Sequence, residues 1–271
     1  MELPRYLRGM KFELKLLGTG TSTGVPTISC DCITCTSTDP RDKRLRCSAL
    51  ITFNNKNIII DTGPDFRQQF LKYDIKKLNA ILYTHHHFDH IGGFDDIRGI
   101  NFTSRDTLPI YLNTETLKNL SRIFSYAFQD YGETGKGIPM VDVNIISDGT
   151  IEIEGIEITI LPLVHGSLEV LGFRIGDIAY CTDTNSIPQS TLDLMKDLDV
   201  LILDGLRPMK HNTHFNIEEA IDQAKIINAK RTYLTHIAHQ IKHSEIEKSL
   251  PSGIKLAYDG ITFSGKFNGK N

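Results

Sequence analysis

The chain has 271 residues, 40% hydrophobic and 23% charged, which is ordinary globular composition with enough length to bury a large core. Lysine and arginine number 30 against 33 aspartates and glutamates, so the formal charge is −3 and there is no global positive field to gather polyanions. Because no apolar run reaches membrane-span length and MELPRYLRGMKFELKLL lacks a signal-peptide core, we expect a cytoplasmic protein with no membrane partner.

Short β-rich or alternating apolar runs recur along the chain, a pattern typical of strands. In chain order they predict strands over 12–17, 48–53, 57–61, 80–83, 110–112, 151–163, 170–175, 178–182, 200–204, 231–235 and 261–263. Helical periodicity predicts helices over 65–73, 114–128, 188–196, 217–227 and 244–250. Pro188 and Asn216 are N-terminal helix signals for two of these segments.

Each half of the chain is mostly strands followed by helices. This order favours two sheets packed on each other and covered by helices, an α/β four-layer αββα sandwich. No linker rich in serine or proline separates the halves, so 1–271 is predicted to be a single domain. The insertion GETGKGIP, residues 132–139, could be a lid or a plain loop, and the loop is favoured.

The stretch TISCDCITC begins a cysteine-rich loop over 27–47 and places Cys30, Cys32 and Cys35 close together. In a reducing compartment such a cluster indicates a metal site or thiol chemistry before a disulfide. Zinc held by protein alone normally takes four ligands, and no fourth thiol follows at a short zinc-finger spacing. A metal with a distant fourth ligand, a nucleophilic thiol and a disulfide are therefore all open at this point.

A basic run lies beside these cysteines: Arg41, Lys43, Arg44 and Arg46. It is the clearest local candidate for contact with a polyanion such as nucleic acid. A solvated loop is the favoured interpretation of the run.

The strongest chemical signal is LYTHHHFDHIGG, residues 82–93, where a predicted strand ends and an HxHxDH pattern follows. His85 and His87 can share one metal, and Asp89 and His90 can hold a second one beside it. Imidazole and carboxylate ligands suit zinc, manganese or iron, so the motif does not select the metal. A chance histidine-rich surface loop is the alternative.

This pattern resembles the metallo-β-lactamase-fold hydrolases, whose first metal motif is THxHxDH. The resemblance continues in LVHGS, YCTDT and YLTHIAHQ, which place His165, Asp183 and His236 after predicted strands. It implies one metal on His85, His87 and His165, a second on Asp89, His90 and His236, and Asp183 bridging the two. Asp61, in IIIDTGPD, matches the family's early aspartate, which orients a metal ligand.

The resemblance implies a hydrolase with two divalent metals in its active site, zinc or manganese, with iron or nickel as further options. Two such cations, roughly 3.5–4 Å apart, lower the pKa of a bridging water and stabilise charge on the attacked group. The bridging hydroxide is then the nucleophile. Within this site Asp89, Asp61 and His214 are the residues assigned to catalysis.

His214 selects the branch of the family. It lies in KHNTHFNIEEAIDQA, where the phosphodiesterase branches, the tRNA 3′-processing endonucleases and the carbon–phosphorus lyase accessory phosphodiesterases, have a catalytic histidine. Its role would be to stabilise or protonate the leaving oxygen or to contact the phosphate. A surface residue at the start of a helix is the alternative, and His211 is a competitor for the role.

The accessory phosphodiesterases also carry CxCxxC early in the chain and a histidine three residues after the last active-site ligand. By this resemblance His239 completes a structural zinc site with Cys30, Cys32 and Cys35. The expectation of a homodimer rests on the resemblance alone.

The leading prediction is a phosphodiesterase for small or cyclic phosphodiesters. A tRNA 3′-processing endonuclease is the alternative, although a nucleic acid partner is not favoured by the net charge. A non-catalytic zinc-stabilised binding module is a third hypothesis, and thioester or lactam hydrolysis is a weaker one.

Overall fold

The structure of the chain is a computed structural model that describes residues 10–129 and 137–267. It contains two seven-stranded sheets. The first has the order β14-β1-β2-β3-β4-β5-β6, with β1 (Lys11–Gly18), β2 (Ser48–Phe53), β3 (Lys56–Ile60), β4 (Ala80–Leu82), β5 (Leu108–Leu112), β6 (Val141–Ile145) and β14 (Thr262–Lys266). The second has the order β13-β12-β11-β10-β9-β8-β7, with β7 (Thr150–Ile153), β8 (Ile156–His165), β9 (Leu168–Ile175), β10 (Ile178–Cys181), β11 (Val200–Asp204), β12 (Arg231–Thr235) and β13 (Ile254–Leu256).

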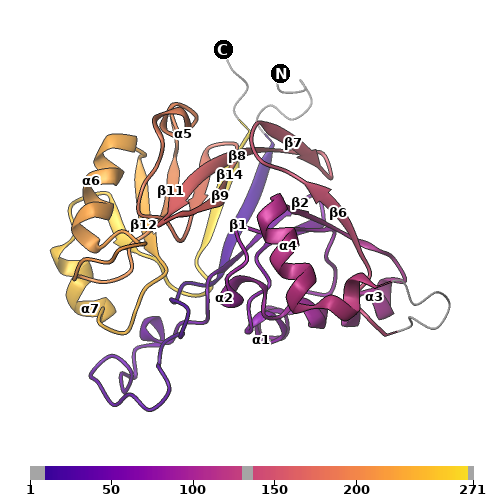
Figure 1. The fold of residues 1–271 in the computed structure, drawn as a ribbon. Helices are drawn as coiled ribbons and strands as arrows, with labels where there is room; N and C mark the ends of the chain where they lie inside the picture. The colour runs from indigo at the N-terminus through magenta and orange to yellow at the C-terminus, as the bar shows by residue number, and fades with distance from the viewer. Residues whose placement is uncertain (1–9, 130–136, 268–271) are drawn as a thin grey trace.

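Helices cover the outer face of each sheet (Figure 1). Those beside the first sheet are α1 (Phe66–Lys72), α2 (Phe88–Ile91), α3 (Ile97–Ser104) and α4 (Thr114–Ile123). Those beside the second are α5 (Gln189–Asp193), α6 (Ile217–Ile227) and α7 (His243–Ile246). Short 3-10 turns lie at Pro40–Asp42, Phe94–Asp96, Ser125–Phe128 and Glu247–Ser249. No helix in the part of the chain that the structure describes is both long and apolar enough to cross a membrane.

Strand alternation builds the layers, because successive side chains of a strand point to opposite faces. In β11, Ile202 belongs to the buried cluster between the two sheets, whereas Leu203 belongs to the cluster that includes Ala220 of α6. In β3, Ile60 faces the same inter-sheet core, and Ile59 clusters with Leu120 of α4. The predicted αββα sandwich of the metallo-β-lactamase fold is therefore confirmed.

Most predicted elements are present, with differences that have local causes. The run 151–163 is a hairpin, because Glu154 and Gly155 have φ values of 52° and 78° and form a two-residue turn between β7 and β8. The helix predicted over 114–128 ends at Ile123, after which Ser125–Phe128 forms a 3-10 turn. Helix α6 covers 217–227 as predicted.

Asn216 caps α6 reciprocally with Glu219. Helix α5 is shorter than predicted, and Pro188 is its N-cap. Strands β6 and β13 and helices α2 and α3 were not predicted. Of the 132–139 insertion, 132–136 lie outside the described residues.

The parallel strands of both sheets end at a common edge. Strands β3 and β4 are parallel in one sheet, and β10, β11 and β12 are parallel in the other. The two edges are joined where the Leu171 N–H donates to the Thr84 carbonyl at 2.9 Å. Side chains that follow these strands are consequently brought together from distant parts of the chain.

Candidate metal centre

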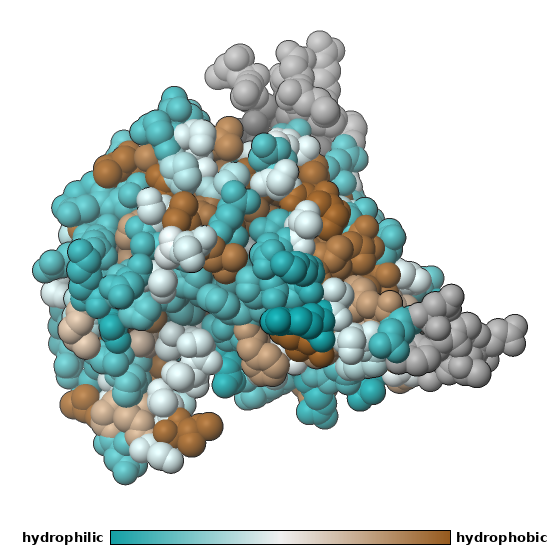
Figure 2. All heavy atoms as spheres, viewed as in Figure 1, coloured by the Kyte–Doolittle hydropathy of each residue, from teal (hydrophilic) through white to brown (hydrophobic). Residues whose placement is uncertain are grey.

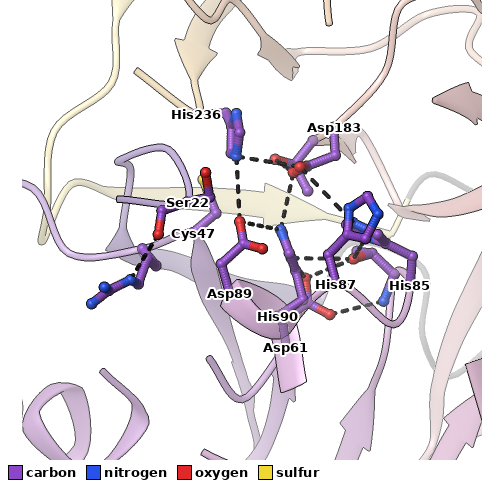
Figure 3. A network of polar contacts seen from close by, with 12 residues as sticks. Ser22, Cys47, Asp61, His85, His87, Asp89, His90, Asp183 and His236 are labelled. Carbon is purple, nitrogen blue, oxygen red and sulfur yellow. Dashed lines mark hydrogen bonds and ion pairs between the residues drawn. The ribbon is translucent and has the colours of Figure 1, made fainter. Parts of the chain in front are cut away.

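The seven predicted metal ligands meet at this common edge, and Figure 3 labels all of them except His165. They come from the loop after β4 and from α2, from the last residue of β8, and from the residues just after β10 and β12. Their possible ligand atoms form two groups, each within 4.8 Å: His85, His87 and His165 in one, and Asp89, His90, Asp183 and His236 in the other. The fold thus assembles both sets that the resemblance implies.

The first group consists of three imidazoles held in fixed orientations. Nε2 of His85 lies 2.9 Å from Nδ1 of His87, and Nδ1 of His165 donates to the Thr213 carbonyl at 2.6 Å, which leaves Nε2 of His165 free for a ligand. Burial lowers the pKa of His85 well below its usual range and also lowers those of His87 and His165. Neutral imidazole is the form that binds a metal.

The second group mixes imidazole and carboxylate. Nε2 of His90 lies 3.3 Å from Oδ2 of Asp89 and 3.3 Å from Oδ2 of Asp183. Nε2 of His236 lies 3.2 Å from Oδ1 of Asp183. That same Oδ1 is 4.0 Å from Nε2 of His85, so the Asp183 carboxylate lies between the two groups.

The buried nitrogens of the second group fit a divalent cation. Nε2 of His90 and both ring nitrogens of His236 are buried and have no hydrogen-bond partner within the described residues. Burial opposes their charged forms, yet Asp183 and Asp89 raise the pKa of His90 well above its usual range, and Asp183 raises that of His236 to about 9. A cation at this point would satisfy the same carboxylates and nitrogens, and nitrogen and carboxylate donors suit zinc or manganese.

Asp61 holds His90 in place from behind. Its Oδ2 accepts from Nδ1 of His90 at 2.7 Å and from Oγ1 of Thr84 at 2.8 Å, while its Oδ1 accepts the Thr84 N–H at 2.8 Å. These bonds leave Nε2 of His90 facing the cluster. Asp61 is fully buried, and its bond fixes the orientation of His90, a candidate metal ligand.

Three site residues have left-handed backbone conformations. The φ values are 63° for Asp61, 52° for Asp183 and 59° for His236. Side chains other than glycine adopt this region at a cost, and such residues cluster at functional sites. Each residue directly follows or nearly follows a strand, so the turn directs its side chain into the common edge.

His214 lies next to both groups and is buried. Its ring stacks on that of His236, with centroids 4.6 Å apart and an interplanar angle of 11°, and lies 4.5 Å from the His165 ring. The alternative of a surface residue at the start of a helix is therefore wrong. His211 is only half-buried, and its ring lies 5.1 Å from that of His214.

Asp204, at the end of β11, is a site residue that the sequence analysis missed. Its Oδ2 accepts from Nδ1 of His214 at 2.6 Å and from the Thr184 N–H at 2.8 Å. The side chain is fully buried. An aspartate that ends a wholly apolar strand in LILDG was the available signal, since Asp61 and Asp183 follow strands in the same way.

The cysteine-rich loop projects from the lower left of the molecule (Figure 1), and Figure 2 shows hydrophobic residues at its tip. All five cysteines of the chain are free thiols, so the disulfide alternative is not supported. Nδ1 of His239 lies 3.2 Å from Sγ of Cys30 and 3.6 Å from Sγ of both Cys32 and Cys35. A tetrahedral zinc with ordinary bond lengths places sulfur and nitrogen about 3.6 Å apart, so these four residues fit a zinc ion.

The backbone links this cysteine cluster to the active site. The Ile237 N–H donates to the Thr19 carbonyl at 2.9 Å, and the Thr21 N–H donates to the Ile237 carbonyl at 3.1 Å. Ile237 follows His236 directly and precedes His239 by two residues. The N-terminal segment is therefore paired with the short stretch that supplies one histidine to each cluster.

The side chains of the basic run make hydrogen bonds and ion pairs within the chain. Arg41 pairs with Asp39 at 2.7 Å, Arg46 pairs with Asp65 at 2.9 Å, and Nζ of Lys43 donates to the Cys35 carbonyl at 2.9 Å. Arg44 is buried, and its guanidinium donates to Thr19, to the Ala257 carbonyl and to His243. The favoured interpretation, a solvated loop, is wrong for Arg44, because the run holds the loop against the C-terminal part of the chain.

This fold and this set of residues define a metallo-β-lactamase-fold hydrolase. The family model of the beta-lactamase superfamily domain matches residues 56–237, and the chain belongs to this superfamily. Membership in this superfamily supports a metal-dependent hydrolase, which agrees with the histidine and aspartate clusters described above.

Several known proteins are similar to the chain. A crystal structure described as a new diphosphatase from the PhnP family superposes with a TM-score of 0.89 at 41% identity, covering 95% of this chain and 98% of that one. The octanoyltransferase of Porphyromonas gingivalis is 38% identical over 91% of this chain, which spans only 50% of that protein's length. The probable metallo-hydrolase YhfI of Bacillus subtilis is 25% identical over 77% of this chain and 88% of that protein.

Proposed function

We propose that the chain is a dinuclear-metal-dependent phosphodiesterase that hydrolyses small or cyclic phosphodiesters. We extend the proposal to substituted diphosphates, in which the bond cleaved is the anhydride between two phosphates. The observation that carries this proposal is the Asp204–His214 pair, which lies against the ring of His236 at the edge of the ligand cluster. A second, structural zinc site on Cys30, Cys32, Cys35 and His239 is part of the proposal.

The two groups of ligands would hold the metals, and other residues keep those ligands in position. When bound, two divalent cations supply charge stabilisation for the phosphoryl oxygens and an activated water. Asp61 and the Thr213 carbonyl keep the ring nitrogens of His90 and His165 directed at the cluster. The buried histidines and aspartates therefore enter the reaction in fixed positions, which lowers the reorganisation that charge development demands.

His214 has a different task, because Asp204 engages its Nδ1. The proton on Nδ1 is held in the 2.6 Å hydrogen bond to the carboxylate, so Nε2 is the atom available to the substrate. From that atom the ring can donate a hydrogen bond to the phosphoryl group or hold a proton near the leaving oxygen. Phosphodiester hydrolysis explains the buried Asp204–His214 pair more directly than amide hydrolysis at a dinuclear site does.

The comparisons support phosphorus chemistry more than acyl chemistry. The similar structure at 41% identity is described as a diphosphatase and covers nearly the whole of both chains. The octanoyltransferase is about twice as long as the region that matches this chain. Its acyl transfer activity therefore cannot be assigned to the matching region.

The tRNA endonuclease alternative has weaker support. The short form of human tRNase Z superposes with a TM-score of 0.67 at 16% identity, a likeness that shows the fold alone. The basic run at 41–46 was the local candidate for RNA contact, and its side chains are engaged in internal bonds. We therefore place tRNA processing second.

The test is a substrate panel on protein reconstituted with zinc or manganese and analysed for metal. It compares bis(p-nitrophenyl) phosphate, 2′,3′-cyclic nucleotides and ADP-ribose with a tRNA precursor and an octanoyl thioester. We expect the small phosphoesters to have the highest kcat/KM. Preferred cleavage of the tRNA precursor would establish the alternative, and thioester turnover alone would overturn the proposal.

A further inference from the structure

We propose that Arg207 and His211 form an anion subsite beside His214, which binds a second phosphate that the substrate carries next to the scissile one. This inference rests on the proposed phosphodiesterase activity and narrows it to substrates with more than one phosphate, such as substituted diphosphates. Both residues lie in the loop over 205–214, which begins after Asp204 and ends at His214.

The loop is fixed at the edge of the ligand cluster. The Leu206 N–H donates to the Phe215 carbonyl at 3.0 Å, and the Ile217 N–H donates to the Arg207 carbonyl at 3.1 Å. The Ala238 N–H donates to the Leu206 carbonyl at 2.9 Å, which joins the loop to the stretch that follows His236. The backbone of Arg207 is thereby held between the start of α6 and an active-site segment.

Arg207 is a half-buried cation without a carboxylate partner among the described residues. Its Nε atom is buried and makes no hydrogen bond there, and its Nη2 donates to the Lys210 carbonyl at 3.3 Å. Within the same part of the chain, Arg44, the buried arginine of the basic run, also has an unpaired Nε, but its Nη atoms donate to three partners, whereas those of Arg207 have one such bond. Since an unpaired buried donor is costly, the free Nε of this half-buried cation points to an anionic ligand.

His211 adds a second donor on the side of His214. Its Nδ1 accepts the Thr213 N–H at 3.3 Å, so the proton of the neutral ring is on Nε2. The ring lies 5.1 Å from that of His214. Burial, His214 and Arg207 lower the pKa of His211 against the opposing charge of Asp204, which favours the neutral ring.

The chemistry of the pair selects its ligand. A guanidinium and an Nε2–H offer only donors, and a planar guanidinium matches the oxygens of phosphate. Oδ2 of the nearby Asp204 is bonded to His214 and to the Thr184 N–H, and its buried Oδ1 has no partner among the described residues. On α6, Glu219 caps the helix through the Asn216 N–H and lies 3.9 Å from Nζ of Lys210. A substrate phosphate held by Arg207 and His211 would extend from the atom at which His214 acts.

The test compares two substrates in the metal-loaded enzyme. ADP-ribose carries a second phosphate joined to the scissile one, whereas bis(p-nitrophenyl) phosphate carries none. Arg207→Gln is expected to lower kcat/KM for ADP-ribose about 10- to 100-fold, the effect of a lost charge-assisted bond, and to change that for bis(p-nitrophenyl) phosphate by less than about 3-fold. His211→Ala should act in the same direction, and Arg207→Lys should restore part of the loss. Arg67→Gln, at an exposed site on α1, is the charge control and should leave the ratio unchanged.

Equal losses on both substrates, or none, would overturn the subsite. A wild-type enzyme that cleaves neither substrate would overturn the proposed function instead. In that case calorimetric titration with pyrophosphate decides the subsite separately: tighter binding by the wild type than by Arg207→Gln supports it, and equal binding overturns it. His211→Ala provides the same comparison if Arg207→Gln does not fold.

Discussion

Nδ1 of His214 lies 2.6 Å from Oδ2 of Asp204, a fully buried carboxylate at the end of β11. The pair joins a strand end to the start of α6 and lies against the rings of two candidate metal ligands, His165 and His236. Because Asp204 is fixed by the Thr184 N–H as well, the orientation of His214 is set by the fold before any substrate binds.

Replacing either member of this pair should impair the reaction with the metals still bound. We expect His214→Ala and Asp204→Asn each to lower kcat on a small phosphodiester by about 10²- to 10⁴-fold, the usual contribution of a positioned acid or base. Kinetics and metal analysis of the same preparations are the measurement. Asp199→Asn is the matched control, because Asp199 precedes the other end of β11 and pairs with Arg231 at the surface. Loss of a metal from His214→Ala would make His214 a ligand instead.

Asp61→Asn should weaken metal binding without removing a ligand. The substitution disrupts the carboxylate that holds Nδ1 of His90 and the N–H and hydroxyl of Thr84. Loss of such a supporting partner typically costs 10- to 100-fold in metal affinity, and we expect about that for one of the two active-site metals. Competition with a chromogenic chelator measures it. Unchanged affinity would show that Asp61 does not orient His90.

Cys30→Ser should remove one zinc and leave the active-site pair. Sγ of Cys30 is 3.2 Å from Nδ1 of His239, and three remaining ligands hold zinc poorly. Metal analysis should fall by one equivalent, and the melting temperature should fall with it. Cys181→Ala, a buried thiol outside the cluster, should keep its full metal content. Full zinc content in Cys30→Ser, with an unchanged melting temperature, contradicts the assignment.

Asp259 should make the metal-free protein less stable as the pH rises. Burial raises its pKa to about 6, against the opposing Leu45 N–H, Thr19 and Arg44. Because the folded pKa lies above the unfolded value, the folded state binds more protons between about pH 4 and pH 6, and stability falls across this window. A shift of about two units corresponds to roughly 3 kcal/mol. Urea unfolding of wild type and Asp259→Asn at pH 4 and pH 6 measures it: the wild type should lose more, and parallel losses would contradict the shift.

Local spacing explains what the sequence could predict. His85, His87, Asp89 and His90 lie within one loop after a strand, so the HxHxDH pattern already defines a ligand set. The more distant ligands required the resemblance, because only the folded sheets bring them to the common edge.

Other features depend on tertiary contacts that no local pattern encodes. Asp204 can be recognised as a site residue only from its hydrogen bond to His214 in the folded chain. Strand β6 lies at the edge of its sheet with half-exposed side chains, and β13 has three residues, so neither shows a clear period. The basic run looked solvated because its partners, such as Asp65 and the Ala257 carbonyl, lie elsewhere in the chain.

The pairing of Ile237 with Thr19 and Thr21 has a practical consequence. His236 and His239 lie on one short backbone segment. The candidate active-site cluster is at one end of it and the cysteine cluster is at the other. An oxidant or chelator that reaches the cysteine cluster would act three residues from His236 and outside the active site, and the backbone bonds of Ile237 to Thr19 and Thr21 would still hold His236 in place.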